Sequence, residues 1–303
     1  MTGPRILLLG VTGQVGQALH PHLAALGDVA AHGRTTCDLG DPAQLRDVIR
    51  NSRPNLIVNA AAYTAVDRAE TDADLCRRVN AEAPQVLAEE ARRAGAWLIH
   101  YSTDYVFDGK KASAYLEDDT PAPLNVYGRT KLAGDLAIAA CAQDYTILRV
   151  SWVYSPSGRN FANTILNLAS TRHELKIVAD QFGAPTPADL IATTTSALVE
   201  RHIMRGDSGS TELARGVFNL APSGRTSWHQ YAVELVREAK RQGRALTLPE
   251  DKIIPITTAE YPTPAERPKN SSLDTAKIRH LLGADLPPWQ VFLHDFVARA
   301  PRA

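Results

Sequence analysis

Residues 97–103 read Trp-Leu-Ile-His-Tyr-Ser-Thr, and Tyr-Gly-Arg-Thr-Lys follows at 127–131 after a polar, proline-rich loop. The first run is apolar as far as Tyr101 and predicts a buried strand that stops at two hydroxyl side chains. The second run begins a predicted helix, in which positions i and i+4 share a face, so Tyr127 and Lys131 should line one cleft. Thr103 stands at the carboxyl end of its strand, where open parallel sheets bind ligands.

Tyr127, Lys131 and Thr103 are therefore the candidate catalytic residues. A neighbouring ammonium favours phenolate, so we expect Lys131 to lower the pKa of Tyr127 from its ordinary value of about 10. The phenol could then protonate a ketone while Thr103 hydrogen-bonds the same oxygen. A chain with nine tyrosines can carry Tyr-x-x-x-Lys by chance. The weight of the motif comes from its position after the strand-terminal Ser-Thr.

A glycine loop opens the chain. Ile6–Leu9 predicts a strand buried on both faces, and Gly10-Val-Thr-Gly13-Gln-Val-Gly16 follows it. The first spacing is wider than in the usual Gly-x-Gly-x-x-Gly dinucleotide loop, but the physics is the same. Glycines let the backbone approach a pyrophosphate, which then lies at the N-terminus of the helix predicted at 17–25. A plain glycine-rich turn is the alternative.

The second predicted strand, Val29–His32, indicates which dinucleotide binds, because Arg34 follows it. A chain that prefers NAD usually places an acidic residue here for the ribose 2′-hydroxyl, whereas an arginine suits a 2′-phosphate. We therefore favour NADPH, with NADH possible, and an exposed loop arginine is the alternative. Asp38 and Leu39, which end the next segment, could frame the adenine.

Small residues follow the third predicted strand, Leu56–Val58. They let a flat cofactor lie against backbone, so we expect this run to pass beneath the nicotinamide. The run reads Asn59-Ala60-Ala61-Ala62-Tyr63-Thr64. Asn80, inside one long helix predicted from Asp72 to Ala94, is expected to be a satisfied polar group of the helix and not a catalytic one.

Strands alternate with helices of ten or more residues, which predicts parallel strands joined by right-handed crossovers. We expect an α/β fold, a doubly wound parallel (Rossmann-type) sheet with a smaller C-terminal substrate-binding lobe. Residues 1–150 and about 186–221 would form the cofactor-binding domain, and 151–185 and 222–303 the lobe. Further strands are predicted at 145–150, 175–178 and 216–220, and helices at 160–170, 189–204, 228–241 and 288–299, while 249–268 is expected to be extended.

Composition excludes several functions. A chain of 303 residues with 44% hydrophobic residues, 22% charged residues and no net charge is typical of a soluble globular protein, without the basic footprint for nucleic acid. Cys37, Cys76 and Cys141 show no metal or disulfide spacing and are expected to be reduced thiols. Without a signal peptide or an apolar run near ~18 residues, we expect no membrane partner and a cytoplasmic location.

The chain resembles the extended short-chain dehydrogenase/reductases, and more closely the dTDP-4-dehydrorhamnose reductases, over nearly its whole length. The glycine loop and Tyr-x-x-x-Lys specify only the superfamily. The narrower group is indicated by Ser102-Thr-Asp-Tyr-Val-Phe107 and by Tyr261-Pro-Thr-Pro-Ala-Glu-Arg-Pro268. Arg149-Val-Ser-Trp-Val-Tyr154 and Asp180-Gln-Phe-Gly-Ala-Pro-Thr186 extend the resemblance.

The resemblance implies that NAD(P)H reduces the 4-keto group of dTDP-4-dehydro-L-rhamnose to give dTDP-L-rhamnose. It implies that Tyr127 donates the proton, that Lys131 activates it and anchors the ribose, and that Thr103 binds the carbonyl. Asp104 and Trp152 would lie at the sugar, and Arg267 could clamp the diphosphate, with a surface arginine as the alternative. The implied cofactor contacts are Gly13, Gln14, Val15, Asp38, Leu39, Ala62, Tyr63 and Thr64, to which the motifs add Gly10, Gly16, Arg34 and Ala60.

Some members of the resembled family join two subunits through magnesium held by glutamates. The matching positions here are Ala18, Asp189 and Gln290, and one carboxylate of three is a poor site for a hard cation. We therefore expect no metal, a monomer or weak homodimer, and a dTDP-sugar as the partner.

Two alternatives stay open. The first is another nucleotide-sugar reductase, or a dehydratase or epimerase, although Tyr105 stands where such a dehydratase typically has a glutamate. The second is a non-catalytic regulatory subunit that binds the cofactor, as in the beta subunit of methionine adenosyltransferase.

Overall fold

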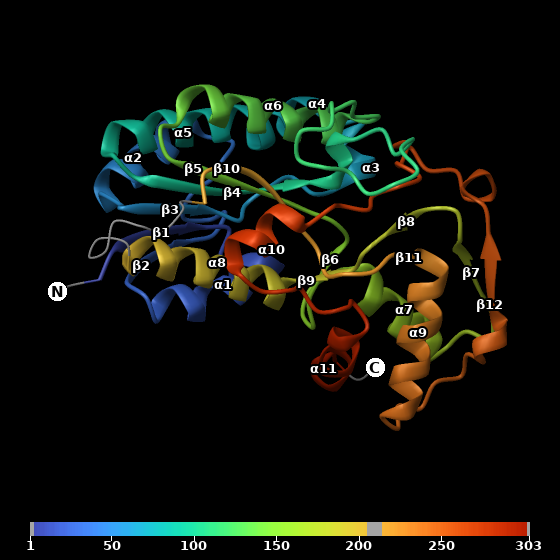
Figure 1. Ribbon diagram of the computed structural model, residues 1–303. Coiled ribbons are helices and arrows are strands. Elements are labelled where there is room, and N and C mark those ends of the chain that lie inside the picture. Colours follow the sequence, from blue (N-terminus) through green and yellow to red (C-terminus); the bar gives the residue numbers. More distant parts are fainter. Residues whose placement is uncertain (1–2, 205–213, 302–303) are drawn as a thin grey trace.

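A six-stranded parallel sheet forms the centre of the computed structural model, which describes residues 3–204 and 214–301 (Figure 1). The strand order is β10-β5-β4-β3-β1-β2. The strands are β1 (Arg5–Leu9), β2 (Asp28–His32), β3 (Leu56–Asn59), β4 (Trp97–Thr103), β5 (Tyr145–Val150) and β10 (Gly216–Leu220). β3 and β4 are buried at every residue because helices cover both faces of the sheet. The predicted doubly wound parallel sheet is confirmed.

The two faces of the sheet carry separate apolar cores, because successive side chains of a strand point to opposite faces. Leu7 and Leu9 pack with α2 (Pro42–Ser52), α5 (Ala83–Ala94) and α6 (Val126–Cys141). Leu8 packs with α1 (Gln14–Ala24) and α8 (Ala188–Met204) on the other face. Figure 1 shows the first group of helices above the sheet and the second below it.

The helix between Asp72 and Ala94 is not the single regular helix expected. α4 (Ala73–Arg77) is followed by a π-helical turn at Arg78–Glu82 before α5 begins. Pro84 has no N–H to donate to the carbonyl of Asn80 and its ring would meet that oxygen, so the helix widens by one residue. The carboxamide of Asn80 holds the backbone of Tyr63, accepting from its N–H at 2.9 Å and donating to its carbonyl at 3.0 Å.

α6 lies very close to neighbouring backbone at two glycines. A Cβ on Gly128 would lie 2.2 Å from the carbonyl oxygen of Tyr105, and one on Gly134 would lie 2.2 Å from that of Asn80. Asn125 caps this helix by accepting from the N–H of Gly128 at 2.8 Å. Because Gly128 and Gly134 have no side chain, α6 can lie this close to the backbone of Tyr105 and Asn80.

A second lobe, drawn in the lower part of Figure 1, has an apolar core of its own. Its helices are α7 (Phe161–Ala169), α9 (Trp228–Arg241) and α11 (Val291–Arg299). Ser227 caps α9, the helix predicted at 228–241, because its hydroxyl accepts from the N–H of Gln230 at 3.1 Å. Three short strand pairs accompany these helices: β7 (Leu175–Val178) with β12 (Ile253–Ile256), β8 (Phe182–Gly183) with β11 (Thr226–Ser227), and β6 (Val153–Tyr154) with β9 (Thr186–Pro187).

One helix that was expected from the sequence to belong to the second lobe lies outside it. α10 (Ala276–Leu282) packs against β10, and Ile278 and Leu281 belong to the core beneath the sheet. Among the described helices, none is both long and apolar enough to cross a membrane.

Candidate active site

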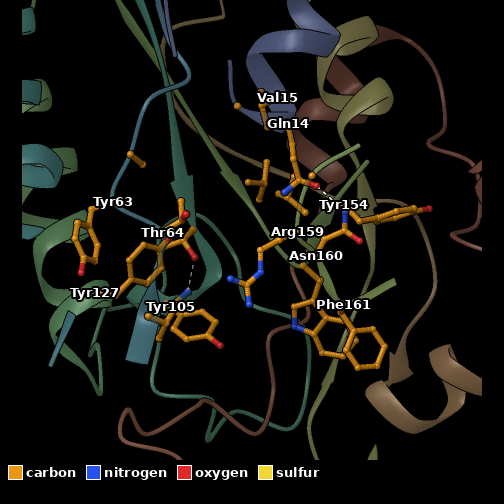
Figure 2. Close-up of a pocket in the computed structure, with 18 of the residues that line it drawn as sticks. Gln14, Val15, Tyr63, Thr64, Tyr105, Tyr127, Tyr154, Arg159, Asn160 and Phe161 are labelled. Carbon is orange, nitrogen blue, oxygen red and sulfur yellow. Dashed lines mark hydrogen bonds between the residues drawn. The ribbon is translucent and has the colours of Figure 1, made fainter. Parts of the chain in front are cut away.

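A cavity of about 1260 Å³ extends from the carboxyl ends of the sheet strands to the second lobe. In Figure 2, Tyr105 and Tyr127 lie on one side of it and Phe161 on the other, with Gln14 and Val15 above. The sequence predictions that line it are Gly10, Gly13, Gln14, Val15, Arg34, Asp38, Leu39, Ala60, Ala62, Tyr63, Thr64, Thr103, Asp104, Tyr127, Lys131, Trp152 and Arg267. Gly16 does not line the cavity: a Cβ there would lie 2.1 Å from the carbonyl oxygen of Gly10, so this glycine closes the loop on itself.

The glycine loop fits a dinucleotide. Gly10 adopts φ +81°, and a Cβ on it would lie 2.6 Å from the backbone nitrogen of Ala61, so the loop packs directly on the end of β3. No side chain caps α1 after Gly13, and its first turn contains no acidic residue. The N–H groups and positive end of this helix are therefore available to phosphate oxygens.

Thr103 is buried at the end of β4, and its hydroxyl already has partners. Oγ1 donates to Oδ1 of Asp104 at 2.9 Å and accepts from the N–H of Tyr105 at 3.2 Å. It also hydrogen-bonds the phenol of Tyr127. The only hydroxyl proton of Thr103 points to Asp104, so the O–H must rotate before it can donate to a ketone.

Tyr127 and Lys131 line the cavity from the same helix, as predicted, but the expected effect on the phenol is wrong in this structure. Burial raises the pKa of Tyr127 well above its ordinary value, and the hydrogen bond to Thr103 opposes that rise only in part. The amine of Lys131 instead lies 2.7 Å from the carbonyl oxygen of Tyr101 and 3.0 Å from Nε2 of His100. Burial lowers the pKa of Lys131 to about 8.

Asp104 is the second titratable group beside the phenol. Burial raises the pKa of its carboxyl to about 6, against hydrogen bonds from Ser271 and Thr103. A buried carboxyl whose pKa lies near neutrality can hold or release a proton under ordinary conditions. Its position beside Thr103 places it at the same end of the cavity as the phenol.

Arg267 is held in place by a carboxylate. Its guanidinium makes two parallel contacts with Asp67, at 2.9 Å to Oδ1 and 2.7 Å to Oδ2. The Arg267 side chain in turn holds the pKa of Asp67 below its ordinary value. The fork is thus oriented at the cavity wall, and Asp67 occupies the face that a phosphate would otherwise contact.

Several cavity residues were missed by the sequence reasoning. Figure 2 shows Arg159 reaching into the space between the two walls. Asn160 caps α7 and donates to Oε1 of Gln14 at 2.8 Å, so it ties the second lobe to the glycine loop. Trp228 was also missed, and it stacks on the predicted Trp152, which adopts φ +48°, with 3.6 Å between ring centroids. A polar residue directly before an apolar helix was the signal that could have found Asn160.

Comparisons with known proteins agree on one group. The sequence model of the family described as "RmlD substrate binding domain" matches residues 4–301. The dTDP-4-dehydrorhamnose reductase of Escherichia coli is 45% identical over 290 residues, covering 94% of each chain. The enzyme of that name from Burkholderia thailandensis is 43% identical over 286 residues, covering 94% of this chain and 95% of its own.

A solved structure gives the same result. The dTDP-4-dehydrorhamnose reductase of Bacillus anthracis, crystallised in complex with NADP, superposes with a TM-score of 0.86 at 30% identity. The match covers 99% of this chain and 100% of the other.

Proposed function

This chain belongs to the dTDP-4-dehydrorhamnose reductase family, and on that premise we propose which of its residues carry out the reaction. It is an NADPH-dependent oxidoreductase that reduces the 4-keto group of dTDP-4-dehydro-L-rhamnose in dTDP-rhamnose biosynthesis. One observation supports the assignment of residues: Tyr127, Thr103 and Lys131 line the same cavity as the glycine loop.

The cofactor would lie along the carboxyl ends of β1, β2 and β3. Bound NADPH supplies a hydride to the ketone carbon. Gly10 and the first turn of α1, including Gln14 and Val15, would hold its pyrophosphate. Arg34 would bind the 2′-phosphate, and Asp38 with Leu39 would frame the adenine. The backbone at Ala60 and Ala62–Thr64 would lie beneath the nicotinamide.

Tyr127 would give its proton to the ketone oxygen as that oxygen gains negative charge. A buried phenol with a raised pKa keeps its proton at neutral pH, so the donor is present in nearly every molecule. Rotation of the Thr103 hydroxyl from Asp104 towards the substrate would add a second donor to the same oxygen. Lys131 would then donate a hydrogen bond to the phenolate from the next turn of α6 and bind the ribose.

The substrate would occupy the part of the cavity next to the second lobe. Asp104 and Trp152 would contact the sugar, and Arg267 would bind the diphosphate through N–H groups that are not donated to Asp67. Arg159, which reaches into the middle of the cavity, offers a second positive charge to the phosphates.

Three expectations stay predictions. They are the assembly as a monomer or weak homodimer, the cytoplasmic location, and the division into a cofactor-binding domain (1–150 and about 186–221) and a substrate-binding lobe (151–185 and 222–303), from which α10 is excepted because it packs against β10.

The test is to mix the protein with the 4-keto nucleotide sugar and to follow absorbance of the reduced nicotinamide. NADPH and NADH are compared at equal concentration, and the sugar product is analysed by chromatography. We expect consumption of NADPH in equal amount to the rhamnose nucleotide formed. No consumption would overturn the reductase assignment, whereas a new sugar formed without net consumption would favour an epimerase.

A further inference from the structure

His100 is a buried residue of β4 for which the reaction described so far has no role. It is 1% exposed. Side chains alternate along a strand, so His100 points to the same face as Leu98, towards α6. Its Nδ1 lies 3.0 Å from Nδ2 of Asn59, and its Nε2 lies 3.0 Å from Nζ of Lys131. The imidazole therefore sits directly behind the lysine of the active site.

The orientation of the Asn59 carboxamide is fixed by the backbone. Its Oδ1 accepts from the N–H of Ala61 at 3.2 Å, and a backbone N–H can only donate. The Nδ2 group of Asn59 is consequently the one that faces the imidazole, and it also can only donate. Nδ1 of His100 must therefore accept, so it carries no proton.

The remaining ring nitrogen then carries the proton. Burial lowers the pKa of His100 well below its ordinary value, so the ring is neutral. A neutral imidazole has one N–H, and with Nδ1 accepting it must be on Nε2. The Nε2–H bond thus points at Nζ of Lys131.

An ammonium does not suit this position. It has three donors and no lone pair, so a charged Lys131 would set two donors against each other across 3.0 Å. An uncharged amine satisfies both neighbours, because Nζ can accept from Nε2–H and donate to the carbonyl oxygen of Tyr101 at 2.7 Å. The hydrogen-bond directions alone favour the amine.

We propose that His100 is a positioning residue for Lys131: Asn59 fixes the imidazole tautomer so that Nε2–H is donated to the lysine nitrogen. The consequence for turnover rests on the proposed function, whereas the tautomer does not. The amine of Lys131 is then held in the cavity wall by His100. Its protonation depends on the direction of two hydrogen bonds, from Asn59 to His100 and from His100 to Lys131. The pKa of Lys131 is lowered to about 8, which is the same direction, so the uncharged amine predominates above that pH.

Two other titratable groups near Lys131 shift its pKa upwards. Asp135, one turn further along α6, and Cys76 of α4 raise the pKa of the lysine. Asp135 itself accepts from the hydroxyl of Ser102 at 2.5 Å, and Arg149 lies 3.9 Å from it. The phenol of Tyr127 lies on the cavity side of the same helix. His100 is the neighbour that offers a donor to the lysine, so it opposes Asp135.

The tautomer can be measured directly by NMR on protein with ¹⁵N-labelled histidine, in which long-range couplings distinguish Nε2–H from Nδ1–H. The His100 signals are assigned by their loss in His100→Gln, and the other histidines serve as internal controls. We expect the Nε2–H form in the wild-type protein. The Nδ1–H form, or a doubly protonated ring at neutral pH, would overturn the proposal.

Asn59→Asp reverses the network with almost no change of shape. Its carboxylate can still accept from the N–H of Ala61, but it now accepts a hydrogen bond from Nδ1–H of His100 as well, which leaves a lone pair on Nε2 to face the lysine. We expect the Nδ1–H tautomer in this variant and a titration midpoint of Lys131, followed by ¹³Cε chemical shift, higher by about one pH unit or more. An unchanged midpoint would overturn the proposal.

The pH profile of turnover links the network to function. In Asn59→Asp the pH dependence of kcat/KM with NADPH should shift in the same direction as the lysine titration, which a purely structural role would not produce. If the wild-type protein consumed no cofactor, the proposed function would fail while the NMR result could still stand. The two failures are therefore distinguishable.

Discussion

Replacement of Tyr127 by phenylalanine removes one oxygen from the active site and little else. The ring of Tyr127 packs edge-on against Tyr105, with 5.7 Å between centroids at 77°, and a phenylalanine ring keeps this contact. Thr103 keeps its bonds to Asp104 and to the backbone of Tyr105. We expect a folded protein whose free energy of unfolding changes by about 1 kcal/mol or less.

The rate should fall far more than the stability. Loss of a positioned proton donor slows a reaction by roughly 10²–10⁴-fold, which corresponds to about 3–5 kcal/mol in the activation barrier. The structure favours the upper part of this range. The hydroxyl of Thr103 points to Asp104, so no second donor is already aimed at the ketone.

The assay measures kcat and KM from NADPH consumption, with dissociation of NADPH followed separately by fluorescence. Tyr145→Phe is the matched control, since it removes a phenol from β5 that does not line the cavity. We expect kcat to fall in Tyr127→Phe alone, with NADPH affinity within about twofold of wild type because the glycine loop is untouched. Wild-type turnover in Tyr127→Phe would refute the proton-donor role. A loss confined to NADPH affinity would assign the residue to binding instead.

Three further perturbations test other parts of the molecule. Gly10→Ala, at φ +81° and against Ala61, should lower the free energy of unfolding, measured in urea, by roughly 2–4 kcal/mol. The control Gly243→Ala, at φ +76° in open space, should lower it by about 1 kcal/mol. Equal losses would contradict the close packing of the loop. Arg34→Ala should raise KM for NADPH about tenfold and leave that for NADH unchanged, and equal effects on both would remove the 2′-phosphate contact. Glu90→Gln should cost about 1–2 kcal/mol at pH 7, because Glu90 is 4% exposed and pairs with half-exposed Arg50 at 2.7 Å. Arg50 lowers the pKa of Glu90, so this contribution is present above the unfolded pKa of about 4.3 and is lost as pH falls through the folded value; a difference that persisted at pH 2 would contradict it.

The sheet could be predicted from sequence because its inner strands, β1, β3, β4 and β5, are almost wholly buried and therefore appear as short apolar runs. The glycine loop and the Tyr127–Lys131 pair of α6 could also be predicted, since their spacing is set by local backbone geometry. The helix at 72–94 was predicted as regular from its helical apolar spacing, although Pro84 stands within it. The proline in fact frees the carbonyl of Asn80, and the chain accommodates it with a wider turn.

What the sequence could not provide depends on contacts between distant segments. His100 reads as part of an apolar strand, and only the packing of β3 beside β4 brings Asn59 to its ring. The pKa of Tyr127 was expected to fall because Lys131 is four residues away, but burial outweighs that proximity and the amine bonds elsewhere. Arg267 could be proposed as a clamp, whereas its pairing with Asp67, two hundred residues earlier, could not.

The two glycines of α6 have a consequence for how finely the reacting groups are placed. At Gly128 and Gly134 the helix approaches neighbouring main chain more closely than any residue with a β-carbon would permit. Adding a single methyl at either site would have to push the whole segment outwards, and Tyr127 and Lys131 would move together away from their positions in the cavity wall. Substitutions to alanine there should thus abolish turnover although neither position contacts substrate, since the alignment of phenol and amine depends on side chains that are not there.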